Sequence, residues 1–355
     1  MKRSFTEILL EWYSVNKRDL PWRRVHDPYC IWVAEIILQQ TRVMHGTAYY
    51  YRFLKAFPDI LSLAAASVEQ VLKIWEGLGY YTRARNMHET AQRIVREFHG
   101  KFPCKYEELL KLKGIGPYTA AAIVSIAFHQ PVPVVDGNVF RVLSRLFALK
   151  APFNTSEGKK GVSRLAGTLI PPDRPGDFNQ ALMEFGALQC IPGQPDCSVC
   201  PLKQWCMAKK QDIVEEIPVR SKHPRIITRY LHYLVWINNG NVLVKQRKDK
   251  DIWHKLFDFP EIVTDLERNP ERTFAGFLHK ERLPMSMSGN IFISGPILHQ
   301  LTHRRVIARF YHVKDNKWPG DLYRKYIRAP LNELKAYAFP RLITAYMEEY
   351  PERFM

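Results

Sequence analysis

Four cysteines within 17 residues constrain this sequence more than any other feature. They are spaced Cys190-x6-Cys197-x2-Cys200-x5-Cys206. A disulfide framework would spread cysteines through a small secreted domain, whereas this chain clusters them and opens on no secretory signal. Four thiolates so close in sequence can close around one metal centre, either zinc or iron–sulfur. Zinc ribbons usually carry two Cys-x2-Cys pairs, and this segment has one. The spacing therefore predicts a metal-bearing protein of a reducing compartment.

Length and charge narrow the class of protein further. The 355 residues are enough for two domains. Lys and Arg number 52 against 35 Asp and Glu, and the net charge of +17 is shared by both halves. Such a basic chain suits a polyanionic partner, most simply nucleic acid. No apolar run is long enough to span a membrane, and Glu7 and Glu11 interrupt the apolar N-terminal stretch. We expect a monomeric, cytoplasmic bacterial protein.

The sequence pattern divides the chain into a helical part and an α+β part. Residues 1–207 show helical periodicity punctuated by Gly and Pro. Helices are expected to begin at Asp27-Pro28 and to cover 67–76, 83–98, 106–112, 118–128 and 138–148. Residues 208–226 are charged and weakly patterned, as is typical of a linker. Residues 227–355 combine a hairpin at Asn239-Gly240, a β-rich stretch at 289–313 and C-terminal helical patterns.

A glycine turn precedes one of the expected helices. Residues 112–122 read Leu-Lys-Gly-Ile-Gly-Pro-Tyr-Thr-Ala-Ala-Ala. Gly114 and Gly116 permit a tight turn with exposed amides, and amides at a helix N-terminus bind phosphate well. An ordinary helical hairpin would show the same turn. The two glycines therefore predict a DNA-backbone contact only in combination with other features.

Two carboxylates are candidates for chemistry. Glu35 lies in Ile-Trp-Val-Ala-Glu-Ile-Ile-Leu, which is apolar on every side and therefore typical of a buried helix. Burial raises the pKa of a carboxyl group, as a general acid requires. Asp136 precedes the expected helix near Asn138 and would cap it. Each has a purely structural alternative, an internal hydrogen bond for Glu35 and capping for Asp136.

Taken together, these motifs resemble the helix-hairpin-helix DNA glycosylase superfamily. The glycine hairpin is followed by a Pro-rich loop and by Asp136 at a helix start. The cysteine spacing resembles the [4Fe-4S] loop of the endonuclease III and MutY family. The resemblance implies one [4Fe-4S] cluster on the four cysteines. It also implies that Glu35 protonates the leaving base, that Asp136 stabilises or attacks the sugar cation, and that Asn138 positions them.

The residue after the hairpin distinguishes two kinds of glycosylase. Members of the family that also cleave the strand carry a lysine there, and this chain has Tyr118. A phenol cannot form the Schiff base that a lysine amine forms. The resemblance therefore implies a monofunctional enzyme, which removes a base without efficient strand cleavage.

Three segments are similar to MutY-type adenine DNA glycosylases. Residues 18–23 resemble their adenine-pocket segment, residues 35–43 their catalytic helix and the loop that enters the duplex, and residues 77–86 a further signature. In that family Gln40 and Tyr80 would fill the stack around an extruded base. The DNA-contacting residues that the resemblance implies in these segments are Arg18, Leu20, Trp22, Arg23, Gln40, Thr41 and Tyr80.

The C-terminal part resembles the MutT-like module of these enzymes, a Nudix-like α+β domain. Residues 253–261 are similar to a segment of that module, but nothing approximates the Arg-Glu-x-x-Glu-Glu box. Without those metal-binding carboxylates the domain should recognise rather than hydrolyse. The family's recognition loop often reads Phe-Ser-His, and here the matching residues are Leu301, Thr302 and His303.

The domains expected are therefore a glycosylase with its iron–sulfur loop at 1–207, a linker at 208–226 and a recognition domain at 227–355. The expected activity is hydrolysis of adenine from duplex DNA in which adenine lies opposite 8-oxoguanine or G. One alternative is a thymine or damaged-pyrimidine glycosylase on the same scaffold. Another is a non-enzymatic iron–sulfur DNA-binding or electron-transfer protein, against which Glu35 and Asp136 argue.

Overall fold

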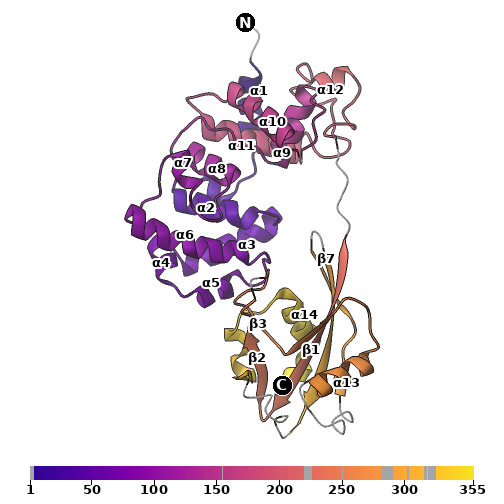
Figure 1. Cartoon of the computed structure of the whole chain (residues 1–355). Helices are drawn as coiled ribbons and strands as arrows, with labels where there is room; N and C mark the ends of the chain where they lie inside the picture. Colours follow the sequence, from indigo (N-terminus) through magenta and orange to yellow (C-terminus); the bar gives the residue numbers. More distant parts are fainter. Residues whose placement is uncertain are drawn as a thin grey trace. The chain divides into compact units, whose positions relative to one another are not determined.

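A computed structural model describes the chain at residues 4–153, 155–219, 226–249, 251–280, 291–301, 304–315, 318 and 325–355. It contains two compact units (Figure 1). One comprises Met1–Ala65 and Asn86–Lys222, and the other comprises Ala66–Arg85 and His223–Met355. The boundaries predicted at 207, 226 and 227 stay predictions. Among the described residues, no helix has the length and apolar character needed to cross a membrane.

The first unit is helical, as the sequence predicts. Its 3₁₀ turn is η1 (Pro21–Arg23). The α-helices are α1 (Phe5–Asn16), α2 (Pro28–Leu38), α3 (Val43–Ala56), α4 (Ile60–Ala65), α7 (Tyr106–Leu109), α8 (Pro117–Ala127), α9 (Gly137–Leu146), α10 (Ser156–Leu169), α11 (Pro175–Leu188) and α12 (Met207–Lys210). Helix α6 (Thr82–Phe98) contains the boundary between the two units, and α5 (Val68–Trp75) belongs to the second. Four of the five helical segments predicted by range are confirmed to within two residues, as is the helix start at Asp27-Pro28, whereas the helix predicted at 106–112 ends at Leu109.

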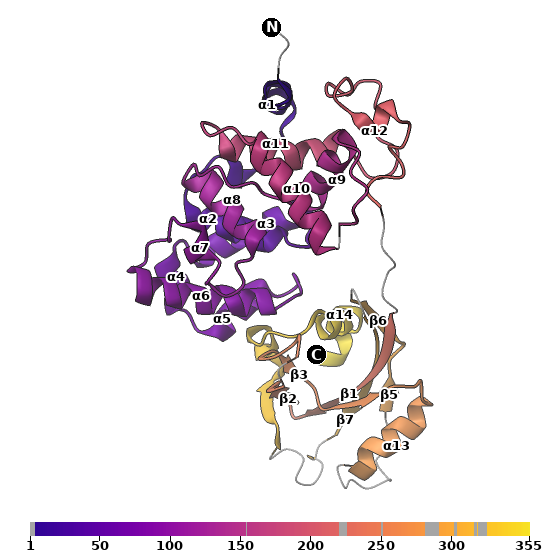
Figure 2. The same cartoon turned by 45° about the horizontal axis from the view of Figure 1, so that its top comes forward.

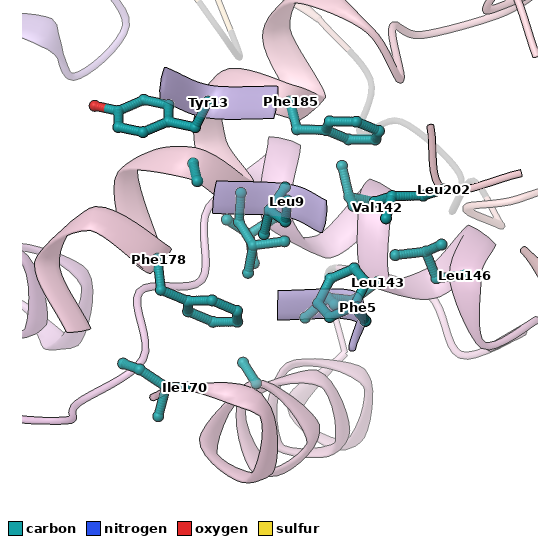
Figure 3. Packing of buried hydrophobic residues seen from close by; sticks show 14 of the residues in the cluster. Phe5, Leu9, Tyr13, Val142, Leu143, Leu146, Ile170, Phe178, Phe185 and Leu202 are labelled. Carbon is teal, nitrogen blue, oxygen red and sulfur yellow. The ribbon is translucent and has the colours of Figure 1, made fainter. Parts of the chain in front are cut away.

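Helices α1, α9, α10 and α11 of the first unit share one hydrophobic core. Leu9 from α1 is fully buried between Leu143 of α9 and Phe178 and Phe185 of α11 (Figure 3). The start of α1 follows from its capping box, in which Ser4 and Glu7 each accept a backbone N–H. Packing of this core fixes α9 and α11, the two helices that supply Asp136 and the far wall of the cavity described below.

The second unit is built on a mixed sheet (Figure 2). Its strands are β1 (Ile227–Asn238), β2 (Asn241–Gln246), β3 (Phe257–Asp258), β4 (Glu261–Thr264), β5 (Ile291–Ile293), β6 (Ile297–Gln300), β7 (Arg304–Lys314) and β8 (Ile327–Pro330). The main path runs β3-β2-β1-β7-β5, while β4 pairs with β1, β6 with β7 and β8 with β2. Besides α5, its helices are α13 (Pro270–Lys280), α14 (Arg341–Glu349), η4 (Leu331–Ala336) and η5 (Pro351–Phe354).

The strand register of the second unit confirms the hairpin and adds a long-range pair. Asn239 and Gly240 have φ values of 44° and 72°, as a tight hairpin between β1 and β2 requires. The central pair, β1 with β7, is parallel, and its register runs from Ile227–Arg304 to Ile237–Lys314. A parallel pair needs a long crossover, and α13 lies within it.

Candidate active site

A cavity of about 300 Å³ in the first unit gathers all four predicted catalytic residues and five of the residues predicted to contact DNA. It is bounded by the η1 segment, α2, the start of α3, the two ends of α8, the start of α9 and the middle of α11. The predicted site residues in its wall are Arg18, Leu20, Trp22, Arg23, Glu35, Thr41, Tyr118, Asp136 and Asn138. Residues distant in sequence thus form one concave, largely buried site, the arrangement expected of a small-ligand pocket.

Glu35 has the electrostatics of a general acid. Helix α2 begins at Pro28 because Asp27 caps it, accepting the N–H groups of Tyr29 and Cys30. Its apolar sides then bury Glu35, which is 7% exposed. Burial raises the pKa of Glu35 to about 7, with a smaller upward effect of Asp136, against the lowering effects of a Tyr118 hydrogen bond and Arg23. A carboxyl group with this pKa carries a proton for much of the time at neutral pH.

Tyr118 stands beside Glu35 in the first turn of α8. Its side chain is hydrogen-bonded to Glu35, and its hydroxyl lies 3.4 Å from the Sδ atom of Met183. Burial, followed by the charges of Glu35 and Asp136, raises the pKa of the phenol well above its ordinary value. Tyr118 is therefore a neutral hydrogen-bond donor at physiological pH.

Asp136 is the N-cap of α9, as the sequence predicts. Its Oδ1 accepts the N–H of Val139 at 2.7 Å, and its Oδ2 accepts the Nδ2 of Asn138 at 2.8 Å. These donors favour the carboxylate, but burial outweighs them and raises the pKa of Asp136. The carboxylate is held in one orientation at the cavity wall by its own helix.

A chain of hydrogen bonds extends from Asp136 toward the cysteine loop. The Nη2 of Arg141 donates to the Oδ1 of Asn138 at 2.9 Å, and its Nε donates to the carbonyl of Cys190 at 2.8 Å. Arg141 also donates to the carbonyl of Gly186. Asn138 is therefore fixed from both sides, which supports the positioning role expected of it. Sequence reasoning missed Arg141, since only the fold brings α9 beside the cysteine loop.

Sequence reasoning also missed Glu184. This residue of α11 lines the same cavity and accepts hydrogen bonds from both Arg18 and Arg23. The sequence does contain a signal for it. The segment Ala-Leu-Met-Glu-Phe-Gly-Ala-Leu places an acidic residue among apolar ones in a helical pattern, as the segment around Glu35 does. The rule that identified Glu35 would have identified Glu184.

The four clustered cysteines line one small cavity beside α9. Burial and the proximity of Cys190, Cys197 and Cys206 raise the pKa of the Cys200 thiol to about 11. Arg145 contacts the Sγ of Cys190 at 3.4 Å, and Lys203 and Lys209 also line the cavity. Four thiols with cationic neighbours form a donor set that fits an anionic metal–thiolate centre.

Four thiols that line one cavity are a donor set that either zinc or an iron–sulfur cluster can use. In the described part of the chain, no group of three or more His, Cys, Asp or Glu is placed to hold a single metal ion.

The glycine hairpin has the predicted backbone conformation. Gly114 has a φ of +79°, and a Cβ there would lie 2.8 Å from the Cβ of Asn86 in α6. Gly116 is the N-cap of α8 with a φ of −90° and open space around it. Gly114 is thus required for conformation and close packing, whereas Gly116 leaves the helix N-terminus accessible.

Other predicted DNA-contacting residues lie outside the cavity wall. Gln40 is exposed at a φ of 61° just after α2. Tyr80, at a φ of 49° and 46% exposed, belongs to the second unit. Leu301 follows β6, and its N–H donates to the carbonyl of Arg304. Thr302 and His303 lie outside the described residues.

Comparisons with known proteins agree with this geometry. Residues 33–172 match the HhH-GPD superfamily of base excision DNA repair proteins, and residues 232–349 match the NUDIX domain. The adenine DNA glycosylase of Buchnera aphidicola subsp. Schizaphis graminum is 35% identical over 264 residues, which cover 74% of this chain and 76% of that protein. The adenine DNA glycosylase of Homo sapiens is 44% identical over 223 residues, which cover 60% of this chain and 41% of the human protein.

Solved structures match the first part of the chain. A thermostable thymine-DNA glycosylase superposes with a TM-score of 0.55 at 30% sequence identity, covering 58% of this chain and 95% of its own. An endonuclease III–DNA complex, at 24% identity and a TM-score of 0.50, shows the same fold.

Proposed function

This chain belongs to the MutY-type adenine DNA glycosylases, and we propose that Glu35 and Asp136 carry out its hydrolysis of adenine from duplex DNA. The observation that carries the assignment is the shared cavity, in which a buried carboxyl with a pKa of about 7 and an oriented second carboxyl line one site. As an adenine DNA glycosylase, the protein is a hydrolase of N-glycosyl bonds that acts in base excision repair.

The reaction divides between the two carboxyl groups. Protonated Glu35 donates its proton to a ring nitrogen of the extruded adenine. The C1′–N9 bond then breaks, and its electron pair leaves with the base. Asp136 stabilises the positive charge that develops at C1′, or bonds to it. Water adds at C1′ and loses its proton to Glu35, which restores the acid. Asn138 and Arg141 hold Asp136 in place during these steps.

Tyr118 supports a reaction without strand cleavage. Its phenol donates a hydrogen bond to Glu35 and contains no amine to form a Schiff base with the sugar. The expected product is therefore an intact strand with an abasic site. Heat or alkali treatment, which cleaves abasic sites, should be needed to reveal it.

We propose that the base opposite adenine is 8-oxoguanine, with G accepted more weakly. The support is the NUDIX match at 232–349 in a sequence that lacks the metal-binding box of that family. Such a domain retains a base-binding fold without the carboxylates for hydrolysis. Leu301, Thr302 and His303 are the residues proposed to contact the 8-oxoguanine.

We propose that Cys190, Cys197, Cys200 and Cys206 hold one [4Fe-4S] cluster. The support is the shared cavity, the cationic Arg145, Lys203 and Lys209 beside it, and membership in a family generally known for this cluster. When bound, the cluster would fix the loop between α11 and α12. Iron content and visible absorption of protein purified without air test this, and stoichiometric zinc without iron would refute it.

A single-turnover assay tests the catalytic assignment. Glu35→Gln should bind an A:8-oxoguanine duplex as wild type does but lose at least about a hundredfold in excision, because the amide cannot supply the proton. The matched control is Glu157→Gln, on the exposed face of α10. Persistent excision by Glu35→Gln would show that another group is the acid.

The same assay tests the substrate. The likeness to a thymine-DNA glycosylase supports the alternative that thymine opposite G is the substrate. Duplexes containing A:8-oxoguanine, A:G and T:G should give fast, slower and negligible release, respectively. Release of thymine from T:G, with none of adenine from A:8-oxoguanine, would replace our proposal with that alternative.

A further inference from the structure

Glu184 is the most heavily hydrogen-bonded carboxylate in the wall of the cavity. Its Oε1 accepts the backbone N–H of Arg18 at 2.9 Å. Arg18 also binds it through Nε and Nη2 at 2.8 and 2.7 Å, and Arg23 through Nη1 and Nη2 at 3.0 and 2.8 Å. Five N–H donors thus meet a group with about four lone-pair sites. The Glu184 side chain is 1% exposed.

These hydrogen bonds hold the η1 segment against helix α11 in the cavity wall. Arg18 precedes η1 and Arg23 is its last residue, so the two arginines enclose Leu20 and Trp22 of the cavity wall, and Glu184 lies on helix α11. The Nη1 of Arg23 also donates to the carbonyl of Arg18, which closes the segment on itself. The shape of the base cavity therefore depends on one buried carboxylate.

Glu184 binds the arginine whose charge acts on Glu35. The charged or titratable groups that face Glu35 are Tyr118 on α8, Asp136 at α9, and Arg23, whose charge favours the ionised form of Glu35. Hydrogen bonds from Arg18 and Arg23 outweigh burial and lower the pKa of Glu184 to about 2, so Glu184 stays ionised. One negative charge therefore lies directly against two positive ones in the cavity wall.

We propose that Glu184 is a positioning residue for adenine excision, which holds Arg18 and Arg23 in the cavity wall and offsets the positive charge that they bring to the cavity of Glu35. The proposal rests on the proposed role of Glu35 as the acid. Without Glu184, the uncompensated charge of Arg23 would stabilise the carboxylate form of Glu35 and deplete the acid.

The pH dependence of single-turnover excision tests this. In wild type the rate should fall as the pH rises through about 7, since Glu35 loses its proton there. In Glu184→Gln the pH at which the rate falls should be about one unit lower than in wild type. At pH values above the fall of the wild type, the rate of the variant should therefore be about tenfold lower than that of wild type. A mere loss of shape would lower the rate at every pH equally.

Three further variants separate charge from structure. Glu184→Asp keeps the negative charge, so its excision rate should fall at the same pH as in wild type even if the rate itself is lower. Adding Arg23→Gln to Glu184→Gln should move the fall back toward higher pH. Asp177→Asn removes a carboxylate from the exposed Arg174 ion pair on the same helix, α11, and should leave the profile unchanged.

The outcomes distinguish this proposal from the one on which it rests. If Glu35→Gln is inactive but Glu184→Gln has an unshifted profile, Glu184 plays no part in controlling the acid and only this proposal fails. If Glu35→Gln still excises adenine, the assignment of the acid itself fails. Should Glu184→Gln not fold, an unshifted profile in Arg23→Gln alone would still overturn the charge argument.

Discussion

At the residue scale, the site depends on one carboxyl group held in an unfavourable environment. The seven other buried positions of α2 are apolar or weakly polar, and burial of Glu35 outweighs the effects of Tyr118 and Arg23, whereas Glu184 receives direct hydrogen bonds from both Arg18 and Arg23. The two buried acids of one cavity therefore have opposite shifts, to about 7 for Glu35 and to about 2 for Glu184. Different surroundings thus keep one carboxyl group protonated near neutral pH and the other ionised within the same cavity wall.

The raised pKa of Glu35 should lower the free energy of unfolding at neutral and higher pH. The pKa of Glu35 lies at about 7 in the folded protein against an ordinary 4.5. The folded state thus holds the proton more tightly, and the free energy of unfolding falls as the pH rises through this window. At about 1.4 kcal/mol for each pKa unit, the penalty reaches about 3 kcal/mol above pH 7.

Glu35→Gln should remove that penalty. We expect it to match wild type in the free energy of unfolding near pH 4 and to exceed it by up to about 3 kcal/mol near pH 8. Urea denaturation followed by circular dichroism at both pH values measures this. Glu157→Gln serves again as the exposed control, and equal stability of Glu35→Gln and wild type at both pH values would contradict the raised pKa.

At the scale of elements, helix starts position the chemistry. Asp27 begins α2, Gly116 and Pro117 begin α8, and Asp136 begins α9. Because each start is fixed by a cap or a proline, the side chains one or two turns later point to predictable places. Tyr118 and Asp136 both belong to such starts, so the helix termini themselves form part of the cavity wall.

The hairpin before α8 offers a matched pair of substitutions. Gly114→Ala must place a Cβ at a φ of +79° and 2.8 Å from Asn86, so it should lower stability by about 2 kcal/mol or more and weaken duplex binding. Gly116→Ala meets open space at a φ of −90° and should change stability little. Thermal denaturation and fluorescence-polarisation binding measure both. Equal effects of the two changes would show that backbone conformation is not what Gly114 supplies.

At the scale of the whole molecule, charge determines how the enzyme meets its substrate. The net charge of +17 is spread over the sequence of both compact units. Binding of a cationic protein to duplex DNA releases counterions, so its affinity depends steeply on salt. Recognition of the base inside the cavity involves shape and hydrogen bonds, so it should not depend steeply on salt.

A salt titration separates the two contributions. We expect duplex affinity to fall more than about tenfold between about 50 and about 200 mM salt. The single-turnover rate at saturating protein should change less than about twofold over the same range. A salt-independent affinity would mean that phosphate contacts contribute little to binding.

Much of this protein was predictable from its sequence. Helix positions, the hairpin at Asn239-Gly240, the roles open to Glu35 and the cap at Asp136 follow from local periodicity, turn chemistry and capping, which act between near neighbours. The family follows from spacings such as those of the cysteines. These features need no knowledge of which segments meet in space.

The tertiary structure alone decided which residues share a site. It brought Glu184 of α11 to Arg18 and Arg23, some 160 residues earlier, and joined Asn138 through Arg141 to Cys190. It also paired β1 with β7 in parallel across α13. Such contacts depend on how helices and strands pack, and packing is set by side chains from the whole chain at once rather than by any local pattern.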